Sequence, residues 1–392
     1  MLAAACGLAR PRPPAAPPLR VGTSGDYPPF SVRAADGAVA GFDVEVARLY
    51  AHDRGRALEL VSFRWPELGV RLAAGEFDVA MSGVTVRGDR LASGTMTRTV
   101  ARTDALLLTR SVGAPDLASL DQPSRRVAVN HGGHLEQIAR ARLPHATIVP
   151  VDDNRSLPGL LKVTEAGIDA IVTDDLEAAT FDQGDFTVAA VLAHDRKAYW
   201  VAPARAALAA DLDAWLGARE RDGTLSRLRL RLLHVDTPSP LPAAALRVVD
   251  LASRRLLLMP LVAAAKRVAQ LALVDAVREA AVVDRAAARA ATLGLDPAAV
   301  RQLAQAEILA ARAIQSAAAP VEGTAPPLAA LRSAIDGVDE ALLHALAEGR
   351  GVAATPQALA AALRADTDLP GFDDAHAATL GTTLAAVLAP AP

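Results

Sequence analysis

The chain has 392 residues, which is long enough for two or three domains that each bury a core. Only 3% of its residues are aromatic and its formal net charge is -3, which excludes an aromatic nucleic-acid platform and an electrostatic polyanion partner. The single cysteine, Cys6, excludes an internal disulfide. No apolar run reaches the length of about 18 residues that a membrane span needs, so no integral membrane span is predicted.

Residues 1–18 have no predicted fold and look like the end of an export signal. Small residues precede Cys6, and a proline-rich tether follows it. We therefore expect an exported protein, located in the periplasm or cell envelope, with Cys6 as a candidate site of lipid attachment.

From residue 19 to about residue 236, short apolar strands alternate with helical segments. The expected strands are LRVGT, LELVSF, FDVAMSG, ALLLT, RRVAVN, TIVPV and DAIVTD, and the helices between them include GFDVEVARLYAHDRG, WPELGVRLAAGE and HLEQIARARL. This alternation predicts open, mostly parallel sheets, and ligands bind to such sheets beyond the carboxyl ends of the strands.

Polar residues gather at these strand ends. A guanidinium such as that of Arg90 can bind a carboxylate bidentately, and the Gly132–Gly133 pair lets backbone amides approach an anion at a helix start. Each residue alone has an ordinary structural explanation, for example Asp174 as a helix N-cap, but their joint occurrence favours a site. The candidate residues are Asp26, Tyr27, Trp65, Ser82, Gly83, Thr85, Arg90, Asn130, Gly132, Gly133, His134, Asp174 and Glu177.

The segments GTSGDYPPF, GFDVEVARLYA, FDVAMSGVTVRGDR and DAIVTDDLEA resemble the periplasmic amino-acid-binding proteins of family 3 over about residues 19–234. The resemblance implies a two-lobed α/β domain over 19–236, with lobe 1 at about 19–108 and 195–236 and lobe 2 at about 109–194. It also implies that Arg90 and Thr85 hold a ligand carboxylate, that Trp65 packs on the ligand, and that Asp174 faces the cleft.

The motifs GTSGDYPPF, AMSGVT, VNHGG and TDDLEA are more closely similar to the cyclohexadienyl dehydratase branch of that family. This resemblance implies loss of water and carbon dioxide from prephenate, giving phenylpyruvate, or from arogenate, giving phenylalanine, without a metal or cofactor. Glu177 is then the candidate general acid, on the same helical face as Asp174. Lys197 is a weaker candidate for the second carboxylate, since an exposed lysine is its ordinary explanation. His134 departs from the small hydroxyl residue that is typical of the branch.

After a linker at 237–244, residues 245–392 contain no predicted strand and indicate an all-α helical bundle. Pro260 is expected to kink the first helix, and Asp296 with Pro297 to begin the second. Arg255 and Lys266 are eleven residues apart, so at about 100° per residue they share nearly one face. The helices offer few acids nearby, and we expect a bound anion to pair with these cations. The other predicted helices lie within PPLAALRSAIDGVDEALLHALAEG, TPQALAAALR and FDDAHAATLGTTLAAVLA.

The segments VDLASRRLLLMPLVAAAK, GLDPAAVRQLAQAEILAARAIQ and LAALRSAID resemble the exported, AroQ-type chorismate mutases. The resemblance implies that three arginines clamp the substrate carboxylates and that Lys266 donates to the ether oxygen of the breaking bond. Gln315 stands where the class usually has Glu, and its amide donates at any pH, which predicts a mutase insensitive to pH between about 5 and 9. The implied clamps are Arg255, Arg278 and Arg332; the departures from the pattern are Val282, Ala311 and the missing cysteine pair.

We therefore expect a bifunctional enzyme in which the bundle makes prephenate and the cleft converts it to phenylpyruvate. Two alternatives remain: an amino-acid receptor with a helical appendage, and an active mutase joined to a degenerate cleft. The expected partners are the small molecules chorismate, prephenate and arogenate, with no nucleic acid, metal or cofactor. The helical domain is also a candidate homodimer interface.

Overall fold

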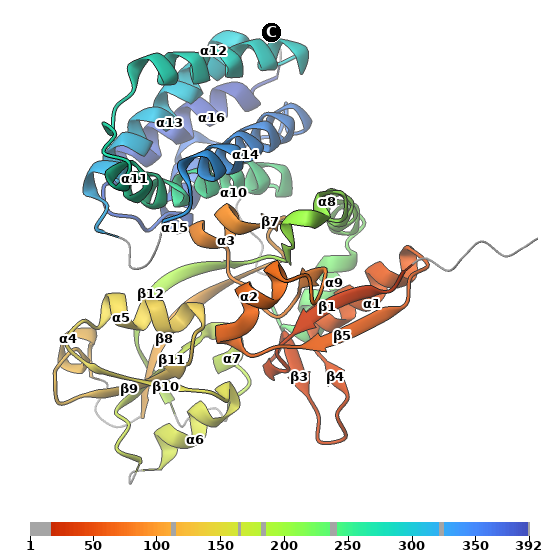
Figure 1. Ribbon diagram of the computed structural model, residues 1–392, viewed down its shortest axis with the longest axis vertical. Helices are drawn as coiled ribbons and strands as arrows, with labels where there is room; N and C mark the ends of the chain where they lie inside the picture. Colours follow the sequence, from red (N-terminus) through yellow and green to blue (C-terminus); the bar gives the residue numbers. More distant parts are fainter. Residues whose placement is uncertain are drawn as a thin grey trace, which may run out of the picture.

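The computed structural model describes residues 17–110, 115–163, 166–181, 186–235, 241–320 and 325–390. Cys6, most of the tether and the linker as far as residue 240 lie outside the described residues. Two α/β lobes lie in the lower half of Figure 1, and a bundle of helices lies above them. The predicted fold class, a two-lobed α/β domain followed by an all-α domain, is confirmed.

The first lobe is built on a five-stranded sheet in which β1 runs parallel to β5 and β6, and β13 runs antiparallel to β6 and β7. Helix α1 covers it because Phe42, Val46 and Tyr50 recur at helical spacing and are buried. The strands, in sheet order, are β5 (Leu58–Ser62), β1 (Leu19–Thr23), β6 (Val79–Ala80), β13 (Trp200–Val201) and β7 (Thr95–Met96); a small sheet holds β2 (Asp26–Tyr27), β3 (Ser31–Arg33) and β4 (Val39–Ala40). The helices are α1 (Phe42–Asp53), α2 (Leu68–Ala73), α3 (Gly88–Ser93), α8 (Ala206–Arg221) and α9 (Thr224–Leu232), with the short turns η1 (Trp65–Glu67) and η4 (Pro203–Arg205).

The second lobe has its own five-stranded sheet, in which β10, β9 and β11 are parallel and β8 and β12 are antiparallel. In sheet order the strands are β10 (Thr147–Val151), β9 (Arg126–Asn130), β11 (Ala170–Asp174), β8 (Ala101–Arg110) and β12 (Phe186–Lys197). The helices are α4 (Leu117–Leu120), α5 (His134–Arg142), α6 (Leu157–Lys162) and α7 (Asp175–Ala178), with the turn η2 (Asn154–Ser156).

Strands β8 and β12 form the hinge, and they differ from the prediction. They pair from Ala101 opposite Lys197 to Arg110 opposite Phe186. The lobe boundary expected at residue 108 therefore falls inside a strand, and the chain passes between the sheets just before Ala101 and just after Lys197. Strand β12 was not predicted, because much of it is partly exposed and it lacks the continuous apolar run of a buried strand.

The bundle contains α10 (Ala243–Leu257), α11 (Met259–Val268), α12 (Ala276–Thr292), α13 (Pro297–Ala317), α14 (Leu328–Glu348), α15 (Pro356–Asp366) and α16 (Asp374–Leu388). As predicted, the chain bends just before Pro260, and the side chain of Asp296 caps α13 by accepting from the amide of Ala298. Helix α12 was not predicted, because its alanine-rich sequence buries few large side chains. No strand occurs in the described part of residues 241–390. Over the described part of the whole chain, no helix combines the length and the apolar character that crossing a bilayer requires.

The bundle packs directly on the first lobe through a continuous apolar core. Buried Leu91, Met96 and Trp200 of the lobe join the same hydrophobic cluster as Leu256 of α10. Helix α3 contacts α10, α11 and α14, as Figure 1 shows. The approach is close at Gly88, where an added Cβ would lie 2.2 Å from a backbone oxygen of α10, so only glycine fits there.

A buried cluster of charges also joins the bundle to the hinge. Asp250 of α10 binds Arg196 of β12 at 2.9 Å, Arg254 at 2.9 Å and Arg247 at 3.2 Å. Arg254 in turn donates to the carbonyl oxygens of Met96 at 2.8 Å and Thr97 at 2.7 Å in the first lobe. Burial alone would raise the pKa of Asp250, but the guanidiniums of Arg254, Arg196 and Arg247 hold that pKa well below its usual range.

Candidate functional site

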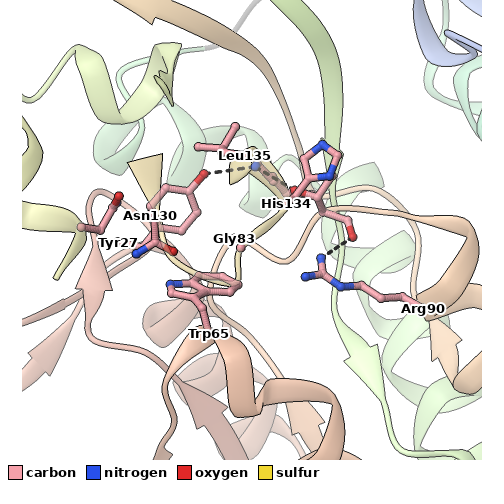
Figure 2. Close-up of a pocket in the computed structure, with 11 residues that line it drawn as sticks. Tyr27, Trp65, Gly83, Arg90, Asn130, His134 and Leu135 are labelled. Carbon is pink, nitrogen blue, oxygen red and sulfur yellow. Dashed lines mark hydrogen bonds between the residues drawn. The ribbon is translucent and has the colours of Figure 1, made fainter. Parts of the chain in front are cut away.

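A small cavity lies between the two lobes (Figure 2). Its volume is about 20 Å³, which holds about one water molecule. The lobes are thus closed on one another, and most of the expected ligand-binding residues meet there. The lining residues are Tyr27, Trp65, Gly83, Thr85, Arg90, Asn130, Gly133, His134, Leu135, Asn154 and Lys197.

Arg90 is the buried cation on the first-lobe side of the cavity. It is 5% exposed, its Nη1 donates to the carbonyl oxygen of Thr85 at 2.7 Å, and its guanidinium lies over the Trp200 ring at 5.7 Å. No carboxylate of the described residues lies within ion-pair distance of it. Burial, together with the nearby charge of Arg87, lowers the pKa of Arg90 to about 9. A buried cation without an acidic partner is suited to an anionic ligand.

Lys197 is the second cation of the cavity, and it is not the exposed lysine that was the ordinary expectation. As the last residue of β12 it is 2% exposed, because the hinge draws it between the lobes. Its Nζ lies 3.0 Å from Thr85 Oγ1, 3.1 Å from the Tyr27 hydroxyl and 3.5 Å from Asp174 Oδ2.

The second-lobe side of the cavity is formed where β9 leads into α5. Asn130 is buried, and its Nδ2 has no hydrogen-bond partner. The His134 ring binds Asp195 Oδ1 through Nε2 at 2.8 Å, which leaves its buried Nδ1 unpartnered. Burial lowers the pKa of His134 despite the adjacent carboxylate, so the ring is a neutral group with one free acceptor.

Asp174 and Glu177 lie one layer behind the cavity. Asp174 caps α7 by accepting from the amide of Glu177 at 2.8 Å, as its N-cap interpretation predicted, and it also accepts from the Tyr27 hydroxyl. Glu177 is fully buried and accepts from Thr173 Oγ1 at 2.6 Å and from Asn154 Nδ2. Burial and the charge of Asp174 raise the pKa of Glu177 well above its usual value, which favours the protonated form of this carboxyl group.

The remaining predicted residues support the cavity. Trp65 lies edge-on to Tyr27 at 5.7 Å, and its Nε1 donates to Asp26 at 3.3 Å. Ser82 accepts from Ser24 beneath the floor. Gly83 and Gly132 have φ of 63° and 69°, which favours glycine, and an added Cβ would strike Tyr27 and Pro66. Asp26, Ser82 and Gly132 do not line the cavity, whereas Leu135 and Asn154, which no motif indicated, do.

The bundle contains a second and much larger cavity, of about 700 Å³. Every residue that the sequence predicted for a bundle site lines this cavity. Val282 and Ala311, where the sequence departs from the chorismate mutase pattern, line it as well. The predicted residues are Arg255, Lys266, Arg278, Gln315 and Arg332.

Arg255 is paired with acids, contrary to the expectation that few acids lie near it. Its Nε binds Asp339 Oδ1 at 3.0 Å and lies 3.6 Å from Glu307 Oε2, whereas its buried Nη1 has no partner. Burial raises the pKa of Glu307 to about 7, although Arg255 opposes the shift. The guanidinium therefore keeps a free donor for a ligand while its charge is partly balanced.

Lys266 and Gln315 form the polar pair on the facing side of this cavity. Lys266 Nζ donates to Gln315 Oε1 at 3.1 Å, which turns the amide nitrogen of Gln315 toward Met259 Sδ at 3.5 Å. Burial lowers the pKa of Lys266 from its usual value. Lys266 keeps further N–H donors and the amide nitrogen of Gln315 is also a donor, so both side chains can donate to one ligand oxygen while their mutual bond persists.

Comparison with known proteins divides the chain in the same way. Residues 19–233 match the bacterial extracellular solute-binding proteins, family 3, and residues 246–316 match chorismate mutase type II. A cyclohexadienyl dehydratase from Pseudomonas aeruginosa is 33% identical over 230 residues, which cover 55% of this chain and 81% of that protein. An L-arginine-binding protein from the same organism is 25% identical over 159 residues, which cover 41% of this chain and 61% of that protein.

The crystal structure of an ancestral amino-acid-binding protein, described as a precursor of cyclohexadienyl dehydratase, is also similar. It is 28% identical with a TM-score of 0.52, and the match covers 55% of this chain and 95% of that chain.

Proposed function

We infer that this chain is a bifunctional chorismate mutase and cyclohexadienyl dehydratase. The chain belongs to family 3 of the bacterial extracellular solute-binding proteins and is related within that family to a cyclohexadienyl dehydratase. It also carries a chorismate mutase type II domain. The observation that carries this inference is the pair of cation-lined cavities on one chain, one backed by the fully buried carboxyl group of Glu177, whose pKa is raised well above its usual value. The bundle makes prephenate, and the cleft removes water and carbon dioxide from it.

In the bundle, the reaction is a rearrangement in which one carbon–oxygen bond breaks and one carbon–carbon bond forms within chorismate. Arg255, Arg278 and Arg332 hold the two carboxylates and so select the compact conformer in which the reacting carbons meet. Lys266 and Gln315 donate to the ether oxygen, on which negative charge grows in the transition state. No covalent intermediate and no proton transfer are required.

In the cleft, Arg90 holds one carboxylate of prephenate, and Lys197 serves the other polar end of the substrate. Neutral Glu177 gives a proton to the departing ring hydroxyl, the ring carboxylate leaves as carbon dioxide, and its electron pair completes the aromatic ring of phenylpyruvate. The ionised Glu177 then recovers its proton from water. Because Asn154 lies between Glu177 and the cavity, its side chain must move aside when substrate enters.

We further propose that the protein is exported, since its family is described as extracellular, and that it supplies a precursor of phenylalanine outside the cytoplasm. The alternative, an amino-acid receptor, draws support from the similarity to the arginine-binding protein. A buried acid with a strongly raised pKa has no use in simple capture, however, and Glu177 therefore favours catalysis.

One assay tests both activities. The full chain is incubated with chorismate, and chorismate, prephenate and phenylpyruvate are followed with time. We expect chorismate to disappear and phenylpyruvate to form. Prephenate that accumulates without further reaction would mean a degenerate cleft, and unchanged chorismate together with tight binding of an amino acid would support the receptor instead.

A further inference from the structure

Asn154 stands between the buried acid Glu177 and the cavity of the cleft. It begins the turn η2 in the second lobe, is only 2% exposed and lines the cavity. Its amide nitrogen Nδ2 donates to Glu177 Oε1. Its amide oxygen Oδ1 is also buried, but it has no hydrogen-bond partner among the described residues. One end of the amide is therefore engaged with the acid, while the other end is unsatisfied.

The hydrogen bonds of Glu177 decide which of its oxygens can carry the proton. A neutral carboxyl group has one oxygen that only accepts and one hydroxyl that donates, whereas an amide nitrogen only donates. Oε1, which meets the Asn154 donor, is therefore the unprotonated oxygen of neutral Glu177. The proton belongs on Oε2, which lies 2.6 Å from the buried hydroxyl oxygen of Thr173.

A proton held there is badly placed, because a general acid must lie within hydrogen-bond reach of the group that it protonates. Oε1 is the oxygen that meets a cavity-lining side chain, and the Asn154 donor occupies that contact. The departing hydroxyl of the substrate has a lone pair that can accept from Nδ2 in place of Oε1. Since Oδ1 is unsatisfied where it lies, the amide loses little when it turns from the acid toward a ligand.

We propose that Asn154 is a positioning residue that gates the acid: it is bonded to Glu177 in the empty cleft and passes its amide donor to the departing hydroxyl when substrate enters. A half-turn of the carboxyl group about its Cγ–Cδ bond then brings the protonated oxygen to the place that the amide has left. The proton moves from Glu177 to the hydroxyl, which leaves as water, and Asn154 neither gains nor loses a proton. This inference rests on the proposed dehydratase function and adds the step that readies the acid only when substrate is present.

The gate also changes the acidity of Glu177. Burial and the charge of Asp174 raise the pKa of Glu177, whereas the hydrogen bonds from Thr173 and Asn154 lower it. Departure of the Asn154 donor therefore raises this pKa further at the step that needs the proton. The other titratable groups around Glu177 are Asp26 and Tyr27 of the first lobe, and Asp104 of β8, which meets α7 at Asp175.

The test compares the pH profiles of the wild type and Asn154→Ala, measured with prephenate on the full chain. The profile of kcat/KM reports the free enzyme, and that of kcat reports the enzyme–substrate complex. Asn154→Ala should move the basic limb of kcat/KM to higher pH by about one unit, the scale of one hydrogen bond, and leave the basic limb of kcat in place. Arg90 and His134 titrate in both chains, so the difference between the chains belongs to Asn154.

Thr173→Val is the matched control, because Thr173 also bonds to Glu177 but does not leave it when substrate enters. It should move the basic limbs of kcat/KM and kcat together. A shift of both limbs in Asn154→Ala, or of neither limb, would overturn the gate and leave the dehydratase intact.

If prephenate does not react, the dehydratase proposal fails, and infrared spectroscopy of the free chain decides whether Asn154 holds the acid. The carbonyl band of the protonated carboxyl group, identified by its absence from Glu177→Gln, should move to higher frequency in Asn154→Ala because one hydrogen bond is lost. An unchanged band would overturn the inference. If Asn154→Ala does not fold, Asn154→Ser, whose shorter side chain cannot span the same contact, takes its place in both measurements.

Discussion

The two cavities of this chain differ in the elements that line them and in their volume. The cleft, at about 20 Å³, is closed on its own side chains, and its residues come from strand ends that are far apart in the sequence. The bundle cavity, at about 700 Å³, is lined by helix faces and by the connection between α11 and α12. The cleft must therefore open to admit substrate, whereas the bundle cavity already has room for it. Hinge motion belongs to one reaction and not to the other.

The two sites also differ in whether the proposed reaction needs a transferred proton. In the cleft, burial and the charge of Asp174 raise the pKa of Glu177, which favours the protonated form that loss of water requires. The bundle places an amide, Gln315, beside the cation Lys266, because the rearrangement requires only donors. The raised pKa of Glu177 thus belongs to the site whose reaction transfers a proton.

In both sites, the residue just before a cation that lines the cavity is an arginine at the interface between the bundle and the lobes. Lys197 of the cleft adjoins Arg196, and Arg255 of the bundle adjoins Arg254. Arg196 and Arg254 both bind Asp250, so the last residues of β12 and the last turn of α10 are held by the same carboxylate. The two sites are chemically separate, but both adjoin the same buried charge cluster around Asp250.

The largest expected effect comes from Glu177→Gln, which keeps size and hydrogen bonding but removes the acid. Prephenate turnover should fall by about 10²–10⁴-fold, the usual scale of general acid catalysis, with little change in prephenate affinity. Because the pKa of Glu177 is raised, wild-type activity should be lost as pH rises through that raised pKa. The kinetics of phenylpyruvate release measure both effects.

Asp175→Asn is the matched control, since Asp175 is on the same helix and its carboxylate accepts from the backbone amides of Asp104 and Leu176. Its prephenate turnover should remain near that of the wild type. If Glu177→Gln also keeps the wild-type rate, Glu177 is only a helix-start residue, and the acid must be sought at Asp174 or His134.

The next effect concerns the buried charge cluster around Asp250, which joins the bundle to the hinge. Asp250→Ala leaves the buried Arg196 and Arg254 without their carboxylate, and we expect a loss of about 3–5 kcal/mol in the free energy of unfolding. Because the folded-state pKa of Asp250 is depressed, its contribution is present at neutral pH and is lost as pH falls through the acid range. Urea unfolding at several pH values measures it.

Asp368→Ala removes an exposed ion pair with Arg142 that also links the bundle to the second lobe. The loss there should be only about 0.2–1 kcal/mol, as is usual for solvent-exposed pairs. Equal losses in the free energy of unfolding for Asp250→Ala and Asp368→Ala would show that burial of the charge cluster adds nothing to stability.

Arg90→Lys should lower prephenate kcat/KM by at least about 100-fold while leaving chorismate turnover unchanged. A lysine cannot reproduce the bidentate grip of a guanidinium on a carboxylate, and a charge-assisted bond contributes about 3 kcal/mol. Arg87→Lys, a change nearby that does not line the cavity, is the control. Unchanged prephenate turnover in Arg90→Lys would remove this residue from the site.

The smallest effect is on the pH profile of the mutase, and here the structure modifies the flat profile that Gln315 predicts. Glu307 ionises as pH rises through about 7, and its charge then competes with substrate for Arg255. We expect KM for chorismate to rise by a factor of about 3 between pH 6 and 8, at nearly constant kcat. Glu307→Gln should make KM flat over this range, and a wild-type KM that stays flat would mean that Glu307 does not act on Arg255.

The sequence predicted those features that depend on local pattern. Strand ends, the Asp296 cap and the break before Pro260 follow from neighbouring residues, and parallel strands bring their carboxyl ends together. The gathering of Tyr27, Arg90 and Asn130 in one cavity therefore followed from the order of elements.

What could not be predicted depends on contacts between distant segments. Lys197 resembles an exposed lysine in sequence, and its burial follows from the hinge strand β12, whose half-exposed pattern hides it. Glu307 and Asp339 reach Arg255 from helices α13 and α14, so sequence spacing gave no sign of them. Asn154 comes from a turn without any motif and covers Glu177 only in the folded protein.

The central claim is that one chain holds two complete and chemically separate sites, and a complementation assay tests it most directly. One variant, Glu177→Gln, is disabled in the cleft; the other, Lys266→Met, is disabled in the bundle. Fed chorismate, the first should accumulate prephenate at the wild-type rate and the second should leave chorismate unchanged, while a mixture of the two should release phenylpyruvate. The account would be contradicted if the folded Lys266→Met chain also failed to convert added prephenate, or if the mixture released no phenylpyruvate.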